Sequence, residues 1–158
     1  MELAKRFIVF LLIIGCVAVI VPKSNFLQVV AIYQDAEYCF YVNSLPVRLS
    51  PQADVVANGS GYIVAVSGQY ADVVFKELNK IEGYSFKFEG SANGAEKVLA
   101  GLRASVVSKE ELGDISLCYA YSGLINNFIT LDDTKINIQI ALRDGFVIVG
   151  IPLILGSF

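Results

Sequence analysis

The chain has 158 residues, of which 55% are hydrophobic and only 17% are charged. This length suits one domain with an appendage, and the composition excludes an intrinsically disordered chain. The formal net charge is −3, and no basic cluster exceeds Lys5-Arg6, so we expect no nucleic-acid partner. Histidine is absent, which excludes Ser-His-Asp and Cys-His catalysis and imidazole metal ligation.

The amino-terminal end predicts a targeting or anchoring segment. Residues 7–21 are all apolar or small, and they follow Lys5 and Arg6 directly. This length lies between that of a cleaved signal peptide and that of a spanning helix. Gly15-Cys16 also fits a lipobox, but the apolar run continues for five residues beyond the cysteine, which favours an uncleaved anchor.

These features define an expected topology. We predict a membrane anchor or signal segment over residues 1–23 and an extracytoplasmic domain over residues 24–158. Because a basic flank stays in the cytoplasm, the amino terminus is expected inside and the domain outside, with a single pass through the cell membrane.

The first part of the domain predicts strands with one long loop. Residues 27–33 and 38–42 are rich in β-branched and aromatic residues, which is typical of strands. Residues 44–61 are interpreted mostly as a loop, with a short strand over residues 55–57 as an alternative. A further strand is predicted over residues 62–67.

Two helices are predicted next. Residues 69–82 carry apolar residues at helical spacing, with Gly83 as the stop. A strand with alternating aromatic residues follows at 84–89. The second helix is predicted over residues 94–104, with Asn93 as its amino-terminal cap.

The remaining residues predict two hairpins. Strands 105–107 and 115–121 flank a polar turn, and the small residues of the second strand share the face that would lie under a helix. At the end of the chain, Asp144-Gly145 favours a two-residue type I′ turn between strands 136–143 and 146–151. Pairing Arg143 with Phe146 places apolar residues opposite each other along one face, so this uncharged end is predicted to be a core hairpin rather than a membrane span.

The cysteines outside the anchor allow two interpretations. An oxidising exterior would permit a disulfide between Cys39 and Cys118. Alternatively, they are two small buried residues that never meet. Catalysis by either thiol is disfavoured, because no histidine is present to raise the thiolate fraction.

Other motifs are weak. Neighbouring strand residues point to opposite faces, so Asp132-Asp133 and Glu110-Glu111 do not form ready carboxylate dyads. Ser108-Lys109 resembles a Ser-Lys hydrolase pair only in sequence. The loop at residues 90–94 precedes a helix but lacks the Gly-Lys-Ser/Thr ending of a phosphate loop, which favours a capping turn. We assign no catalytic, cofactor or metal residue and expect no cofactor.

The carboxyl-terminal half resembles YwmB-type proteins. The matching stretches are Ala120-Tyr121-Ser122, INIQIALR at residues 136–143 and GIPLI at residues 150–154, whereas Gly123 stands where that family has proline. YwmB-type proteins are secreted or membrane-anchored proteins of Gram-positive bacteria with a fold like that of the TATA-box-binding protein. The resemblance implies an α+β fold and an external location, and the family has no established activity to transfer.

The residues and the resemblance together predict an α+β protein. The expected domain is a mixed or antiparallel sheet of about six to eight strands with two helices packed on it, beside one amino-terminal transmembrane helix. The leading functional hypothesis is a non-catalytic module that binds an envelope protein, peptide or other envelope component. The alternative is a cell-envelope hydrolase or transferase that uses carboxylates from separate strands.

Overall fold

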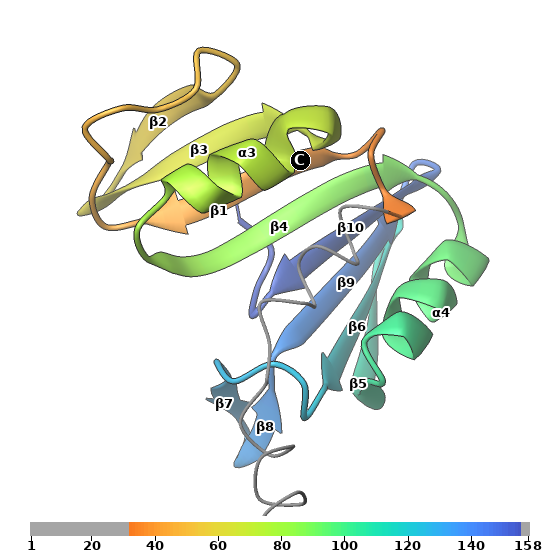
Figure 1. Ribbon diagram of the computed structural model, residues 1–158. Coiled ribbons are helices and arrows are strands. Elements are labelled where there is room, and N and C mark those ends of the chain that lie inside the picture. Colours follow the sequence, from red (N-terminus) through yellow and green to blue (C-terminus); the bar gives the residue numbers. More distant parts are fainter. Residues whose placement is uncertain (1–31, 156–158) are drawn as a thin grey trace, which may run out of the picture.

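The computed structural model describes residues 32–155 (Figure 1). Within them, eight strands form one antiparallel sheet in the order β2-β3-β1-β4-β10-β9-β6-β5, and β7 and β8 pair as a separate two-stranded sheet. The strands are β1 (Glu37–Val42), β2 (Asp54–Asn58), β3 (Gly61–Ser67), β4 (Ile81–Glu89), β5 (Ser105–Leu112), β6 (Ile115–Tyr121), β7 (Ile129–Leu131), β8 (Thr134–Ile136), β9 (Ile138–Arg143) and β10 (Phe146–Ile151), and the helices are α3 (Gly68–Glu77) and α4 (Ala92–Gly101). The predicted α+β class is confirmed, with an antiparallel sheet.

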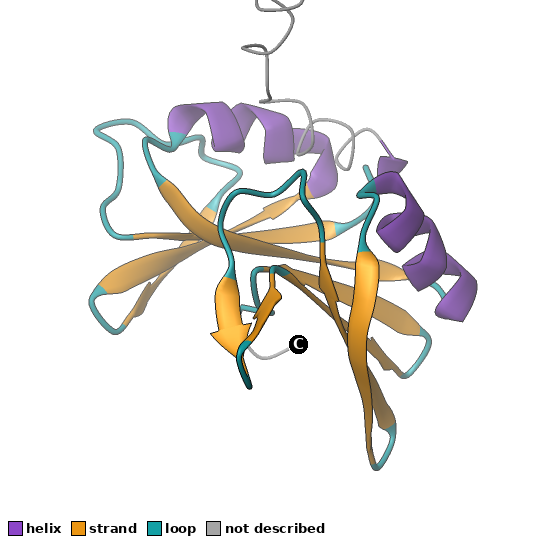
Figure 2. Ribbon diagram, turned by 90° about the horizontal axis from the view of Figure 1, so that it is seen from below, coloured by secondary structure: helices purple, strands orange, loops and turns teal. Residues whose placement is uncertain are grey.

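Both α3 and α4 cover the same face of the sheet (Figure 2). Each helix is amphipathic and turns small or branched residues toward the strands, Ala71 and Val74 in α3 and Ala95 and Val98 in α4. We call the opposite side of the sheet the open face. Because side chains alternate along a strand, Tyr119 of β6 lies on the open face while Ala120 is buried beneath α4.

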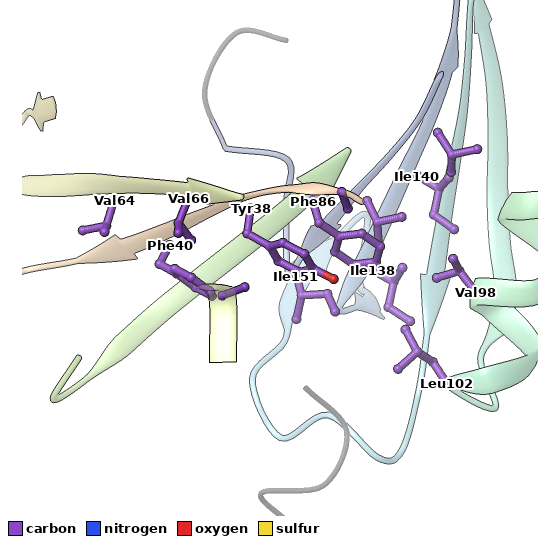
Figure 3. Packing of buried hydrophobic residues seen from close by; sticks show 14 of the residues in the cluster. Tyr38, Phe40, Val64, Val66, Phe86, Val98, Leu102, Ile138, Ile140 and Ile151 are labelled. Atoms are coloured by element: carbon purple, nitrogen blue, oxygen red, sulfur yellow. The ribbon is translucent and has the colours of Figure 1, made fainter. Parts of the chain in front are cut away.

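The hydrophobic core lies between the helices and the sheet (Figure 3). Strand register aligns a row of core residues across five strands: Val66, Tyr38, Phe86, Val149 and Ile140. None of these side chains is more than 6% exposed. Burying a side chain of this size contributes roughly 1.5–3 kcal/mol, so this row is a main source of stability.

The carboxyl-terminal hairpin has the predicted turn and register. Asp144 and Gly145 have φ values of 51° and 80°, as a type I′ turn requires. Arg143 pairs with Phe146, and the expected pairs of Leu142 with Val147 and Ile140 with Val149 are present. The first strand of the hairpin begins at Ile138 rather than at residue 136, because Ile136 is the last residue of β8. The hairpin occupies the centre of the sheet, since β10 also pairs with β4.

The chain after β10 crosses the open face. The backbone N–H of Ile154 donates to Oε1 of Gln139 at 3.0 Å, and Leu155 exchanges hydrogen bonds with the hydroxyl of Ser85 at 3.2 and 3.3 Å. A Cβ atom on Gly150 would collide with the backbone of Leu153 and Ile154. Glycine is therefore required at this crossing.

A buried polar cluster holds the loop after β6. Asn137 is fully buried, and its Oδ1 accepts from the backbone N–H of Ser122 at 2.8 Å. Its Nδ2 donates to the carbonyls of Ser122 and Ile125 at 2.8 and 3.0 Å. The hydroxyl of Ser122 in turn donates to the carbonyl of Leu102 at the end of α4. The cluster thus connects α4 to the loop and to the start of β9.

Several predicted boundaries are wrong. The first helix ends at Glu77 rather than residue 82, because Leu78 is extended at φ −75° and ψ 129° and β4 starts at Ile81. Apolar side chains at positions 78 and 81 fit a helical stripe, and they also fit a chain that leaves the helix and enters the sheet. Gly83, the proposed stop, lies within β4 opposite Tyr41.

The second helix begins earlier than predicted. Its cap is Ser91 instead of Asn93, and the Ser91 carbonyl accepts from the backbone N–H groups of Gly94 and Ala95. Strand β5 is also longer than predicted and extends to Leu112, so that only Gly113 and Asp114 form the turn. An exposed edge strand needs no apolar alternation, which is why its polar end looks like a loop.

Two predictions fall wholly or largely on residues that the structure does not describe. The anchor at residues 7–21 lies outside the described residues, as does most of the strand predicted over 27–33, of which Tyr33 is not in a strand. Within residues 32–155, no helix is long and apolar enough to cross a membrane.

Candidate functional site

A hollow of about 860 Å³ opens between the start of β1, the end of β4 and the first turn of α4. Its size falls within the range of small-molecule and cofactor sites, roughly 300–1,000 Å³. Strand pairing assembles it, because β1 and β10 both lie beside β4. We call this the α4 hollow.

Aromatic rings form one side of the α4 hollow. The ring centroids of Tyr33 and Phe88 are 4.1 Å apart, and Tyr33 also lies 5.6 Å from Phe86 in the core. Burial raises the pKa of Tyr33 above its ordinary value. On the other side of β4, Nζ of Lys87 lies 4.4 Å from the centroid of Phe146, a cation–π contact.

The hollow carries charges of both signs. Lys87 and Lys97 border it together with Asp35, Glu37 and Glu89. Glu37 and Lys87 are direct cross-strand neighbours in β1 and β4. The amino-terminal end of α4 adds a partial positive charge at Ser91, whose side chain makes no capping hydrogen bond. A bound molecule with both a positive and a negative group would therefore find a partner for each.

A smaller hollow of about 400 Å³ lies on the other side of the same helix end. Here Nε of Arg143 is 3.2 Å from Oδ2 of Asp144 and 3.8 Å from Oδ2 of Asp114. The backbone N–H of Gly90 donates to the carbonyl of Gly145 at 2.9 Å. This bond ties the hairpin turn to the loop before α4, so the predicted turn positions one wall of both hollows.

Cys39 and Cys118 do not form a disulfide. Both are free, and the sheet order places β4, β10 and β9 between the strand of Cys39 and that of Cys118. The two strands are four positions apart in the sheet, and neighbouring strands are about 4.8 Å apart. Their separation therefore far exceeds the Cα–Cα distance of about 7 Å that a disulfide can span. The disulfide considered from the sequence is therefore absent. Burial raises the pKa of both thiols, Glu37 raises that of Cys39 further, and Lys109 opposes the rise at Cys118.

The carboxylate pairs have structural roles. Asp132 and Asp133 form the β7–β8 turn with φ values of 45° and 62°. Glu110 and Glu111 alternate along β5, and Oε1 of Glu111 accepts from the hydroxyl of Ser116 at 2.7 Å. Among residues 32–155, no group of three or more acidic or cysteine side chains is placed to hold a metal ion.

The sequence did not predict the α4 hollow. The loop at residues 90–94 is interpreted from the sequence as a capping turn, and the structure agrees, because Ser91 in this loop is the cap of α4. The sequence did not reveal that β1 and β10 bring Glu37 and Phe146 to the same place. A Cβ atom on Gly90 or Gly94 would lie 3.1 or 3.2 Å from the ring of Phe88, so a larger residue at either position would require that ring to shift.

No protein-family model, curated protein or solved structure matches this chain.

Proposed function

We propose that this chain is a membrane-anchored extracytoplasmic domain that binds a peptide or another envelope component in the α4 hollow, without catalysing a reaction on it. The observation that carries the proposal is one hollow of about 860 Å³ bordered by Tyr33 and Phe88 on the helix side of β4, by Phe146 on the open face, and by charges of both signs. Aromatic rings supply apolar contact area, and charged groups fix orientation. An extended peptide with one acidic and one basic group offers this combination.

Site-specific photo-crosslinking in intact cells tests the binding site. A photoreactive residue at Asn93, which is exposed and borders the hollow, is compared with one at Asn79, which is exposed beyond the end of α3. We expect a discrete adduct from position 93 only. Lys97→Glu should reduce the yield of this adduct, because it removes a positive charge that borders the hollow. Lys80→Glu changes a charge outside the hollow and should leave the yield unchanged. Equal adducts from both positions would contradict the proposal.

The proposed location rests on the apolar run at residues 7–21 behind Lys5-Arg6. A reporter fused after Phe158 should be active only outside the cytoplasm. The intact mass of membrane-extracted protein should still include Met1 or Glu2. Cytoplasmic activity would refute the topology, and a diacylated mass beginning at Cys16 would replace the anchor with a lipoprotein.

A hydrolase or transferase is the second candidate. The observation in its favour is that three carboxylates, Asp35, Glu37 and Glu89, border the same hollow. Paired carboxylates act as acid and base in the cleavage of glycosidic bonds. Release of soluble fragments from purified cell walls, lost in Glu37→Gln or Glu89→Gln, would support this candidate. Retained crosslinking at Asn93 without fragment release supports binding alone.

A further inference from the structure

The two edges of the large sheet differ in how they are protected. Strand β5 at one end carries Lys109, Glu110 and Glu111, and its pairing shifts register between Val106 and Ser108. Charges and bulges are the usual devices that stop an edge strand from pairing with another chain. Strand β2 at the other end has regular pairing and a single charged residue, Asp54 (Figure 1).

Strand β2 is exposed along its whole length. All five of its residues are exposed, including Val55 at 40% and Val56 at 61%. Among the described strands it pairs with β3 alone. Exposed valines on an edge strand favour extension of the sheet by another strand.

The register of the β2–β3 hairpin determines which backbone groups face outward. Asn58 pairs with Gly61 across the two-residue turn Gly59-Ser60. In a hairpin with a two-residue turn the closing pair is the hydrogen-bonded kind, which fixes the pattern along β2. Hydrogen-bonded and non-bonded pairs alternate in an antiparallel ladder, so Asn58, Val56 and Asp54 point their backbone groups at β3. Val55 and Ala57 direct theirs away from the sheet.

We propose that β2 pairs antiparallel with β2 of a second copy, about a two-fold axis at Val56. This register sets Val55 opposite Ala57 of the second copy, and each such pair exchanges two hydrogen bonds, so the outward groups of both residues are satisfied. Val56 then faces its own counterpart across a non-bonded pair, where side chains come closest. A shift by one pair would leave some of these groups without a partner.

The polar side chains of β2 favour the same antiparallel register. About the axis at Val56, Asp54 lies opposite Asn58 of the second copy, and a side-chain amide is a suitable donor to a carboxylate. Parallel pairing in register would instead place Asp54 beside Asp54. The two-fold axis is perpendicular to the sheet, so the two open faces form one continuous surface on the same side. The contact is small, and association is therefore weak and depends on concentration.

Cysteine crosslinking of the full-length protein in detergent micelles tests this register. In a background with Cys16, Cys39 and Cys118 replaced by serine, Val56→Cys is compared with Ala57→Cys under mild oxidation. The residues at position 56 face each other, whereas those at position 57 lie on opposite sides of the axis. We expect covalent dimer from Val56→Cys to form at least about tenfold faster.

A charge exchange provides the second measurement. Adding Asn58→Asp to Val56→Cys puts a carboxylate opposite Asp54 of the other copy and should slow crosslinking several-fold. Further addition of Asp54→Asn should restore the rate. Equal rates at positions 56 and 57, or no response to the charge exchange, would overturn the proposal. So would the absence of any dimer, which would leave the edge to an extended segment of a different protein.

Discussion

Replacing Asn137 with alanine should destabilise the protein more than any comparable change at the surface. The side chain is fully buried and makes three hydrogen bonds, one from the N–H of Ser122 and two to the carbonyls of Ser122 and Ile125. Each buried group left without a partner costs about 1–3 kcal/mol, and the Ile125 carbonyl is only partly buried. We therefore expect a loss of about 3–4 kcal/mol, a large part of the 5–15 kcal/mol typical of a domain.

Thermal and urea unfolding of the full-length protein in micelles measures this loss. For a domain of this size the melting temperature should fall by roughly 10–15 °C. Asn126→Ala is the matched control, because Asn126 lies in the same loop and is exposed, and it should change stability by less than about 0.5 kcal/mol. Similar losses for both variants would refute the assignment of the buried cluster.

Asn137→Asp separates hydrogen bonding from side-chain volume. The carboxylate has nearly the same shape, yet it faces two carbonyls in place of donating to them. Burial and these carbonyls should raise the pKa of the new carboxyl group in the folded state. Its contribution is then most favourable below the unfolded pKa of about 3.9 and is lost as the pH rises. The variant should recover toward wild-type stability on acidification, and a penalty independent of pH would contradict this account.

Three further predictions concern other parts of the fold. Asp133→Gly should raise stability by about 0.5–1 kcal/mol, since φ at this position is 62°, and a urea midpoint that falls instead would contradict the turn assignment. Burial raises the pKa of Tyr38 and Tyr84 in the folded state. The stability that these protonated side chains contribute is fully present below the unfolded tyrosine pKa of about 10 and should decline as the pH rises above it. Unfolding curves from pH 8 to 11 should show a shallower decline for Tyr38→Phe than for the wild type. Ile140→Ala should cost about 2–5 kcal/mol in thermal melts, and Gln139→Ala about 1 kcal/mol, because Ile140 is 1% exposed in the core while Gln139 lies on the open face; the reverse order would mean that the register is wrong.

Local signals predicted the carboxyl-terminal hairpin correctly because they specify it almost completely. Asp144-Gly145 selects the turn, the turn fixes the register, and a two-residue periodicity then decides which side chains are buried. Residue composition predicted β1 and β3 to within one residue, and the alternative strand over residues 55–57 corresponds to β2. In these segments local preference and final burial agree.

The errors occur where one pattern fits two structures. The stretch from Leu78 to Ile81 satisfies both a helical stripe and an exit into the sheet, and only the packing of β4 between β1 and β10 decides. Asn137 interrupts an apolar run, and its burial depends on a loop that begins fifteen residues earlier in the chain. A short stretch of sequence around Asn137 does not include Ser122 and Ile125, whose backbone groups satisfy its buried amide.

The α4 hollow and the β2 edge should respond independently to mutation. Phe146 reaches the hollow because β10 pairs with β4, and the bond from Gly90 to Gly145 couples the hairpin turn to the start of α4. A strained turn should therefore disturb both hollows. The β2 edge lies three strands from β4 at the end of the sheet order, and its outward groups are set by the Gly59-Ser60 turn alone. Ligand binding and edge pairing are thus separable by substitution, since each depends on its own hairpin.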